Sequence, residues 1–559
     1  MENVNPLTCM DYPDPDVIRV DDTYYMISTT MYFMPGGVIL RSYDLANWEI
    51  AAYIFDELDG TPAERLQDGQ NSYGKGMWAG SLRYHNGRFY ATFVSHGQEN
   101  THLFTAETVE GPWEHRMIRG YYHDCSLFFA EDGRVFLTHG NREIRLTELS
   151  EDLSGPKEGG VDTVLVCDDR EKVFLGYEGS HLYKIHGRYY LTLIHWPKDK
   201  ARRTEAVFSA DTIEGPYEGG DVFWDDGGYC NMGIAQGGLV DTPDGRWFAV
   251  LFRDSGAIGR IPVLVPVTWD GDTPVFGDNG KLPQEIEIVG TRPDYEYQPL
   301  FVSDWCRKEN GTITCSDMDA QDGIGSYAGL SKTRRLIAPQ WQWNHVPDDS
   351  MWGLLPDGTL GIRTGAVCVN PTQARNTLTQ RMYYPYCEAE VNVLAAGLQD
   401  GDHAGLIALQ GCYAMIGITK LDGKYFLEII ERKEPTKGFG IGGNDTEPGE
   451  VTYREPLIGP NGTAATEADA CATVGIAADF TNMKDTVTFF VRENGVKRVV
   501  GGEHKMYFRL DHFTGARFGL CMWSEKKAGA NVLFTQFQYR LHGNYGVASL
   551  VGKNRILRQ

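Results

Sequence analysis

The sequence predicts an all-β chain that begins with a five-bladed β-propeller and continues into a β-sandwich. A hairpin phrase returns five times in the N-terminal half, as VDDTYYMIS, HNGRFYATF, EDGRVFLTH, IHGRYYLTL and PDGRWFAVL. A second turn phrase follows the first at similar distances, as SYDLANWE, AETVEGPWE, ELSEDLSGPKE and ADTIEGPYE. The C-terminal half alternates apolar and polar residues without this repeat, which is typical of a sandwich.

The first phrase is a two-strand turn whose copies lie one blade apart. Its third turn positions are Thr23, Arg88, Arg134, Arg188 and Arg246, which gives spacings of 65, 46, 54 and 58 residues. Two hairpins in each unit make a four-stranded sheet, and sheets that repeat at this interval indicate a propeller. A sandwich with a recurrent hairpin is the alternative, but sandwiches do not usually repeat two phrases in the same order four times.

The strand that leads into each turn begins nine or ten residues upstream. The equivalent positions at these five strand starts are Asp14, Ala79, Asp124, Glu178 and Gln236. The innermost strand of each blade lines the propeller axis, so we expect these side chains to face one another across a central funnel. Three of them are carboxylic acids, which resist desolvation and raise one another's pKa when they converge. Such a costly arrangement usually marks function, although acids can also cap blade turns or hold a structural cation.

Aromatic residues lie close to these acids in the sequence, at Tyr12, Phe33 and Trp78. Sugar rings stack on aromatic faces, and a glycosidase needs one carboxylic acid to protonate the leaving oxygen and one carboxylate to activate water or attack. The pattern therefore indicates carbohydrate chemistry.

Composition and charge exclude several classes of partner. The 559 residues include 52 Lys and Arg against 76 Asp and Glu, a net charge of −24, and no basic block is long enough to bind phosphates. We expect neither nucleic acid nor membrane as a partner. The N-terminus lacks a signal-peptide pattern, so we expect a cytoplasmic protein unless a signal has been removed. Eleven cysteines without CxxC spacing are read as reduced thiols.

The two predicted domains are the catalytic propeller, residues 1–295, and the sandwich, residues 305–559. The stretch at residues 296–304 has no clear period and is read as a linker. Beyond it, the alternating segments are GTLGIRTGAV, EAEVNVLAAG, AGLIALQG, YAMIGITK, KYFLEIIE, TVTFFVREN and NVLFTQFQYRL.

Three ordered motifs resemble glycoside hydrolase family 43, the five-bladed β-xylosidases and α-L-arabinofuranosidases. They are PDPDVIRVDDTYYMISTT, HDCSLFFAEDGRVFL and YEGSHLYKIHGRYYLT. The resemblance implies that Asp14 is the general base, Asp124 the acid that modulates pKa and orients its partner, and Glu178 the general acid. It also implies inversion at the anomeric carbon, with base and acid about 6.5–9.5 Å apart.

Other residues take their expected roles from the same resemblance. Trp78 in GMWAG, Phe33 and Arg260 in AIGRIPV are expected to contact the substrate. The larger family members carry a jelly-roll, concanavalin-like sandwich, and HFTGARFG resembles the loop by which it closes the active site, so Phe513 is expected to reach the sugar. A core position for Phe513 is the alternative.

The chain departs from the family pattern at two places. His123 and Cys125 flank Asp124 where the family usually has an Asp-Pro-Ser phrase, so His123 is expected to form part of the pocket wall. Gln236 stands where the family often has a histidine whose waters hold an axial cation. No cofactor is expected to be required, and a structural Ca²⁺ or other cation held through waters at Gln236 is left open.

The expected activity is removal of terminal xylose from the non-reducing end of short β-1,4-xylooligosaccharides. An α-L-arabinofuranosidase, or an enzyme with both activities on oligosaccharides derived from arabinoxylan, is the close alternative. A sugar-binding propeller without catalysis is the alternative from a different class, and the three acids argue against it. The sequence leaves a homo-oligomer open.

Overall fold

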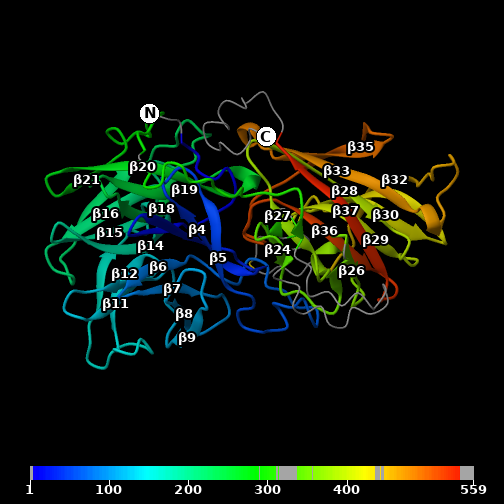
Figure 1. Ribbon diagram of the computed structural model, residues 1–559. Coiled ribbons are helices and arrows are strands. Elements are labelled where there is room, and N and C mark those ends of the chain that lie inside the picture. Colours follow the sequence, from blue (N-terminus) through cyan, green and yellow to red (C-terminus); the bar gives the residue numbers. More distant parts are fainter. Residues whose placement is uncertain are drawn as a thin grey trace.

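The computed structural model describes residues 4–288, 290–306, 308–309, 312–313, 336–355, 357–434, 441 and 446–541. Figure 1 shows two β-rich bodies side by side, the first coloured blue to green and the second light green to red. None of the helices in these ranges has the length and apolar character needed to cross a bilayer.

The first body is a propeller of five four-stranded antiparallel sheets, which confirms the repeat analysis. Blade 1 contains β1 (Asp16–Val20), β2 (Thr23–Ser28), β4 (Gly36–Ser42) and β5 (Glu49–Phe55). Blade 2 contains β6 (Ser81–His85), β7 (Arg88–Val94), β8 (Thr101–Ala106) and β9 (Glu114–Ile118). Blade 3 contains β10 (Ser126–Phe129), β11 (Val135–His139), β12 (Glu143–Leu149) and β13 (Asp162–Cys167). Blade 4 contains β14 (Val173–Ile185), β15 (Arg188–Pro197), β16 (Thr204–Ala210) and β17 (Glu218–Phe223). Blade 5 contains β18 (Ile234–Asp241), β19 (Trp247–Asp254), β20 (Arg260–Asp270) and β21 (Thr273–Phe276), with the short helix η1 (Gly256–Ile258) between its second and third strands.

The two repeated phrases are the two hairpins of each blade. The first phrase joins the innermost strand to the second through a tight turn. In blade 4 the two central residues of this turn, His186 and Gly187, have φ values of 50° and 86°. Two consecutive residues with positive φ form the tight turn whose twist matches antiparallel strands. The second phrase joins the third strand to the fourth, as SYDLANWE does between β4 and β5.

The second body is a sandwich of two antiparallel sheets. The eight-stranded sheet has the order β3 (Phe33–Met34), β24 (Trp341–Asn344), β27 (Leu378–Arg381), β36 (Arg517–Ser524), β29 (Asp402–Leu409), β30 (Ala414–Leu421), β31 (Lys424–Glu431) and β32 (Glu450–Pro456). The seven-stranded sheet has the order β25 (Trp352–Leu354), β26 (Leu360–Arg363), β37 (Asn531–Arg540), β28 (Tyr386–Leu394), β33 (Cys471–Asp479), β34 (Thr486–Glu493) and β35 (Val496–Lys505). The remaining elements are a small hairpin, β22 (Lys308–Glu309) with β23 (Thr312–Ile313), and the short helices η3 (Pro371–Gln373), η4 (Glu467–Asp469) and η5 (Thr481–Met483).

Each of the seven alternating segments contains a sandwich strand, but the alternation misses others. Strand β36 is one of these, because all eight of its residues are buried. A strand covered on both faces is a continuous apolar run rather than an alternating one.

The two bodies share a sheet. Strand β3 belongs to the propeller half of the sequence, yet it pairs with β24 of the sandwich, through Met34 with Trp343 and Phe33 with Asn344. Backbone hydrogen bonds therefore cross the expected domain boundary, because two residues between the strands of blade 1 form a strand of the sandwich sheet.

The carboxylate of Asp11 fastens the sandwich to blade 5. It accepts hydrogen bonds from the backbone N–H of Arg260 and from that of Gly515, both at 2.8 Å. Gly515 can approach this closely because it has no Cβ; a Cβ there would lie 2.6 Å from the Cβ of Asp11. The side chain of Arg381, from β27, donates to the Asp11 carbonyl oxygen at 2.8 Å. One buried residue thus joins three separate segments.

We expect Asp11→Ala to lower the free energy of unfolding by about 2–6 kcal/mol, because two buried N–H groups lose their acceptor at about 1–3 kcal/mol each. Chemical denaturation measures it. The matched control is Asp22→Ala, which removes an exposed ion pair with Arg292 and should cost less than about 1 kcal/mol. Equal stability of the two variants would contradict the role of Asp11.

Candidate active site

The starts of the innermost strands are strained. Asp14, Asp124 and Gln236 have φ values of 50°, 46° and 57°, and Gly179, directly after Glu178, has a φ of 64°. A residue with a side chain gives up roughly 1–2 kcal/mol in this left-handed region. Strain of this kind collects at functional sites, where the surrounding fold enforces it. Here it occurs at three of the five aligned strand starts, Asp14, Asp124 and Gln236, while the glycine after Glu178 adopts the same backbone conformation without strain.

His123, Asp124 and Glu178 form one cluster at the axis. The imidazole Nε2 of His123 lies 3.6 Å from an Asp124 carboxylate oxygen and 3.5 Å from a Glu178 carboxylate oxygen. One ligand atom from each of the three residues lies within 4.8 Å of the other two. Asp124 is buried and accepts a hydrogen bond from the N–H of Gly179 at 3.1 Å, so blades 3 and 4 are joined at the cluster.

Burial and mutual repulsion control protonation in this cluster. Burial raises the pKa of Asp124 to about 7, together with the charges of Glu178 and Asp14 and against the opposing charge of His123. The Asp124 carboxylate in turn raises the pKa of His123 to about 9, with Glu178 and Asp14 acting in the same direction and burial opposing them. At neutral pH the cluster therefore combines an imidazolium at His123 with a partly protonated Asp124 carboxyl group.

Asp14 lies across the axis in an ion pair with Arg260. The Arg260 guanidinium donates to Asp14 at 2.7 Å, and both side chains are more than nine-tenths buried. Arg260 also contacts Asp254 at 3.3 Å. The arginine that we expected to reach the substrate is thus also the direct partner of the expected base.

The sandwich places an aromatic ring beside this ion pair. Phe513 lies in the loop that precedes β36, and the Arg260 guanidinium stacks 4.7 Å from the centre of its ring. The ring of Trp78 lies 5.5 Å from Phe513 and 6.1 Å from His123. The structure therefore brings both expected aromatic residues to the same side of the carboxylates, and it assembles this wall from two domains.

Phe33 lies in the buried cluster behind Trp78 and Phe513, where the structure gives it no open face toward a substrate. Its side chain is 1% exposed, and the guanidinium of Arg517 covers its ring at 3.5 Å from the centre. Phe33 belongs to β3, the strand lent to the sandwich, so its ring is buried between the domains. Sequence proximity to Asp14 did not reveal this pairing.

Gln236 lies next to the cluster. Its side chain touches the position that a Cβ of Gly179 would take, and its backbone N–H donates to the Glu205 carboxyl group at 2.8 Å. Burial raises the pKa of Glu205 to about 8. The structural cation expected at Gln236 would be held through waters; it stays a prediction, and no step of the reaction is assigned to it.

One site residue escaped the sequence analysis. Asn141 donates a hydrogen bond from its side-chain amide to Glu178. It precedes β12, outside both repeated phrases, so the repeats gave no signal for it. Its contact fixes the orientation of the Glu178 carboxyl group.

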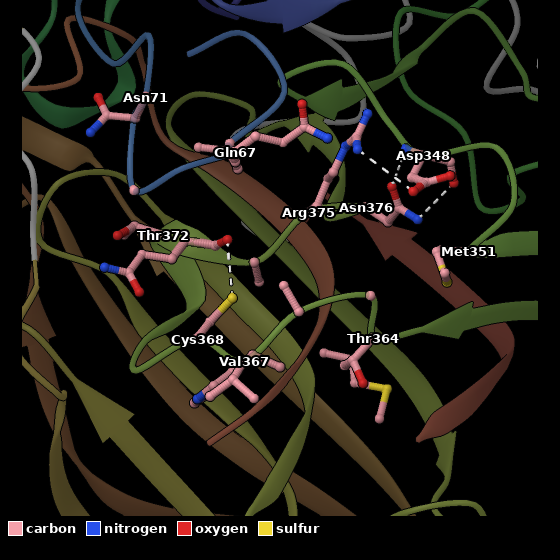
Figure 2. A pocket seen from close by; sticks show the side chains of 18 of the residues that line it. Gln67, Asn71, Asp348, Met351, Thr364, Val367, Cys368, Thr372, Arg375 and Asn376 are labelled. Atoms are coloured by element: carbon pink, nitrogen blue, oxygen red, sulfur yellow. Dashed lines mark hydrogen bonds and ion pairs between the residues drawn. The ribbon is translucent and has the colours of Figure 1, made fainter. Parts of the chain in front are cut away.

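A cavity of about 610 Å³ lies away from the axis, between a propeller loop and the sandwich. Figure 2 shows Gln67 and Asn71 on one side of it and Asp348 with Arg375 and Asn376 on the other. None of the carboxylates of the axial cluster lines this cavity. The chemistry is therefore assigned to the axis, where the acids converge.

Comparisons with known proteins identify the family of both domains. The family model of Glycosyl hydrolases family 43 matches residues 4–274, and that of the Beta xylosidase C-terminal Concanavalin A-like domain matches residues 333–540. A β-xylosidase of Formosa agariphila is 27% identical over 493 residues, which cover 79% of each chain. A non-reducing end α-L-arabinofuranosidase of Bacteroides ovatus is 28% identical over 324 residues, 54% of this chain and 58% of the relative.

A solved structure agrees over nearly the whole chain. The Bacteroides eggerthii protein described as bifunctional GH43-CE superposes with a TM-score of 0.83 and 36% identity, over 97% of this chain and 64% of its own. This chain thus spans about two thirds of that protein's length. With family models matched over both the propeller and the sandwich, the chain belongs to glycosyl hydrolases family 43 and carries a C-terminal concanavalin A-like domain.

Proposed function

We propose that this glycosidase is an inverting exo-enzyme that releases xylose from the non-reducing end of short β-1,4-xylooligosaccharides. The observation that carries the proposal is the wall that Phe513 adds beside Asp14 and Arg260. A funnel narrowed on one side by a second domain suits the end of a short chain better than the middle of a polymer. The β-xylosidase relative supports the choice of sugar.

The proposed roles follow from the contacts of each acid. Asp14, held by Arg260, takes the proton of the attacking water. Glu178, oriented by Asn141, gives its proton to the glycosidic oxygen of the leaving sugar. Asp124 and His123 lie beside Glu178 and complete the cluster from which its proton is given. In an inverting reaction the water enters from the face opposite the leaving group, which requires space between Asp14 and Glu178.

An α-L-arabinofuranosidase is the second candidate, because the Bacteroides ovatus relative is described as one. Xylopyranosyl and arabinofuranosyl groups present similar hydroxyl groups to one pocket. The two candidates share the acids and differ only in the sugar that the pocket selects.

The function is tested with xylobiose and with the p-nitrophenyl β-xyloside and α-arabinofuranoside. We expect the highest kcat/KM among the aryl glycosides on the β-xyloside, and proton NMR of a fresh xylobiose digest should show α-xylose before mutarotation.

Asp14→Asn and Glu178→Gln should each lower kcat by about 10²- to 10⁴-fold, while Asp22→Asn should not. Initial β-xylose would refute inversion, and preference for the arabinofuranoside would replace the assigned sugar. No turnover of any of these substrates would favour a binding protein.

Phe513→Ala should raise KM for xylobiose about tenfold, since a stacking contact on an aromatic ring is worth about 1–3 kcal/mol. The control is Leu510→Ala, an exposed residue of the same loop, which should leave KM unchanged. If Phe513→Ala behaves like its control, the sandwich does not contribute to sugar binding.

His123→Asn should move the alkaline limb of the pH profile of kcat/KM to higher pH, by about 1 pH unit or more. The imidazolium lowers the pKa of Asp124 against the effect of burial, so its loss keeps the Asp124 proton to higher pH, and the limb moves with it. His186→Asn, in the exposed turn of blade 4, is the control. A limb that stays in place or moves to lower pH would contradict the proposed role of His123.

A further inference from the structure

A second layer of polar side chains lies one step further along the innermost strands than the acids. Asp16 follows Asp14 by two residues on β1, Ser126 follows Asp124 by two on β10, and His181 follows Glu178 by three on β14. All three are buried, Asp16 at 0% exposure. A buried polar group on β1, β10 or β14 therefore follows each expected catalytic residue within three positions.

One guanidinium contacts all three of these strands. Arg83, on β6, donates to the Asp16 carboxylate at 2.6 Å and to the Ser126 hydroxyl at 3.2 Å. It also donates to the Leu127 carbonyl at 3.0 Å and lies 3.4 Å from Nδ1 of His181. Blade 2, which has Ala79 where blades 1, 3 and 4 have an acid, thus supplies the arginine that links those three blades.

The chemistry of these contacts suits arginine and no other side chain. A planar guanidinium has five N–H donors in a fixed fork, so it can hold partners in several directions at once. Asp16 also accepts the N–H of Leu82 at 2.8 Å. Burial lowers the pKa of His181 to about 4, so its ring is neutral and Nδ1 can accept a hydrogen bond from Arg83.

The surroundings leave these groups little room to move. A Cβ on Gly238, in blade 5, would lie 2.8 Å from the Asp16 carboxylate. Arg83 also lines a cavity of about 310 Å³. Residues further along the innermost strands, such as Ile18, Phe128 and Leu182, line the same cavity. Arg83 and Asp16 therefore close the axis between the carboxylates and this cavity.

We propose that Arg83 is a positioning residue that sets the separation of Asp14, Asp124 and Glu178 by tying their three strands together beneath the site. The proposal rests on the catalytic roles given above. Arg83 acts through the strands, so its loss should disturb the geometry of the reaction more than the binding of the sugar. A misplacement of about 1 Å can cost about 10²-fold in rate.

The test compares Arg83→Met with Arg19→Met, using an aryl glycoside that the wild type cleaves. Arg19 is the matched control because it lies on β1, pairs with Asp241 of blade 5 at 2.5 Å and lines the same cavity. Among the described residues its side chain hydrogen-bonds to Asp241 and Asp21, and not to β10 or β14. We expect Arg83→Met to lower kcat about 10²-fold with KM within about threefold, and Arg19→Met to keep both within about threefold. Arg83→Lys should restore only part of the loss, because an ammonium group cannot hold three strands.

Circular dichroism and the thermal midpoint check the fold of each variant. If Arg83→Met does not fold, Ser126→Ala and Arg83→Lys decide: a lowered kcat at unchanged KM in both supports the proposal, and wild-type kcat in both overturns it. A folded Arg83→Met with wild-type kcat, a loss confined to KM, or an equal loss in Arg19→Met also overturns it. An error in the assigned sugar would appear in the wild type itself, so the two proposals fail separately.

Discussion

Carboxylates buried together at the propeller axis are the constraint on which this structure depends. A charge leaves water at a high free-energy cost unless an opposite charge or hydrogen bonds compensate it. Each acid at the axis has such a partner: Asp14 has Arg260, Asp16 has Arg83, and Asp124 and Glu178 share His123. The partner comes from another blade in the first two pairs. The charges therefore hold the blades together around the same axis at which they create a reactive site.

The second domain contributes directly to this arrangement, because Phe513 stacks on the guanidinium that pairs with Asp14. Asp11 bonds both the backbone of Arg260 and that of Gly515, so the residue that positions the partner of Asp14 also positions the loop of Phe513. The shared pairing of β3 with β24 fixes the same interface by backbone hydrogen bonds. The contacts that join the two domains thus also place Phe513 beside Arg260. For this reason residues of both domains form the wall of the site.

The sequence predicted the architecture well because the propeller repeats its hairpins. Turn chemistry and period-two alternation are local properties, and both can be read along the chain. Alignment of the five copies placed Asp14, Asp124 and Glu178 at the same strand position. The structure brings Asp124 and Glu178 into one cluster with His123. Strands buried on both faces, such as β36, were missed because burial on two sides removes the alternation.

Local pattern alone was thus enough to determine five blades, a following sandwich and three acids at equivalent strand starts. The tertiary structure alone decided which groups meet them. Phe33 pairs with a strand more than 300 residues away in the sequence and is buried under Arg517, while Asn141 and Arg83 come to the axis from outside the aligned positions. These contacts join residues that are distant in the chain, and their formation depends on the closure of the propeller and on its packing against the sandwich, neither of which leaves a periodic signal in the sequence.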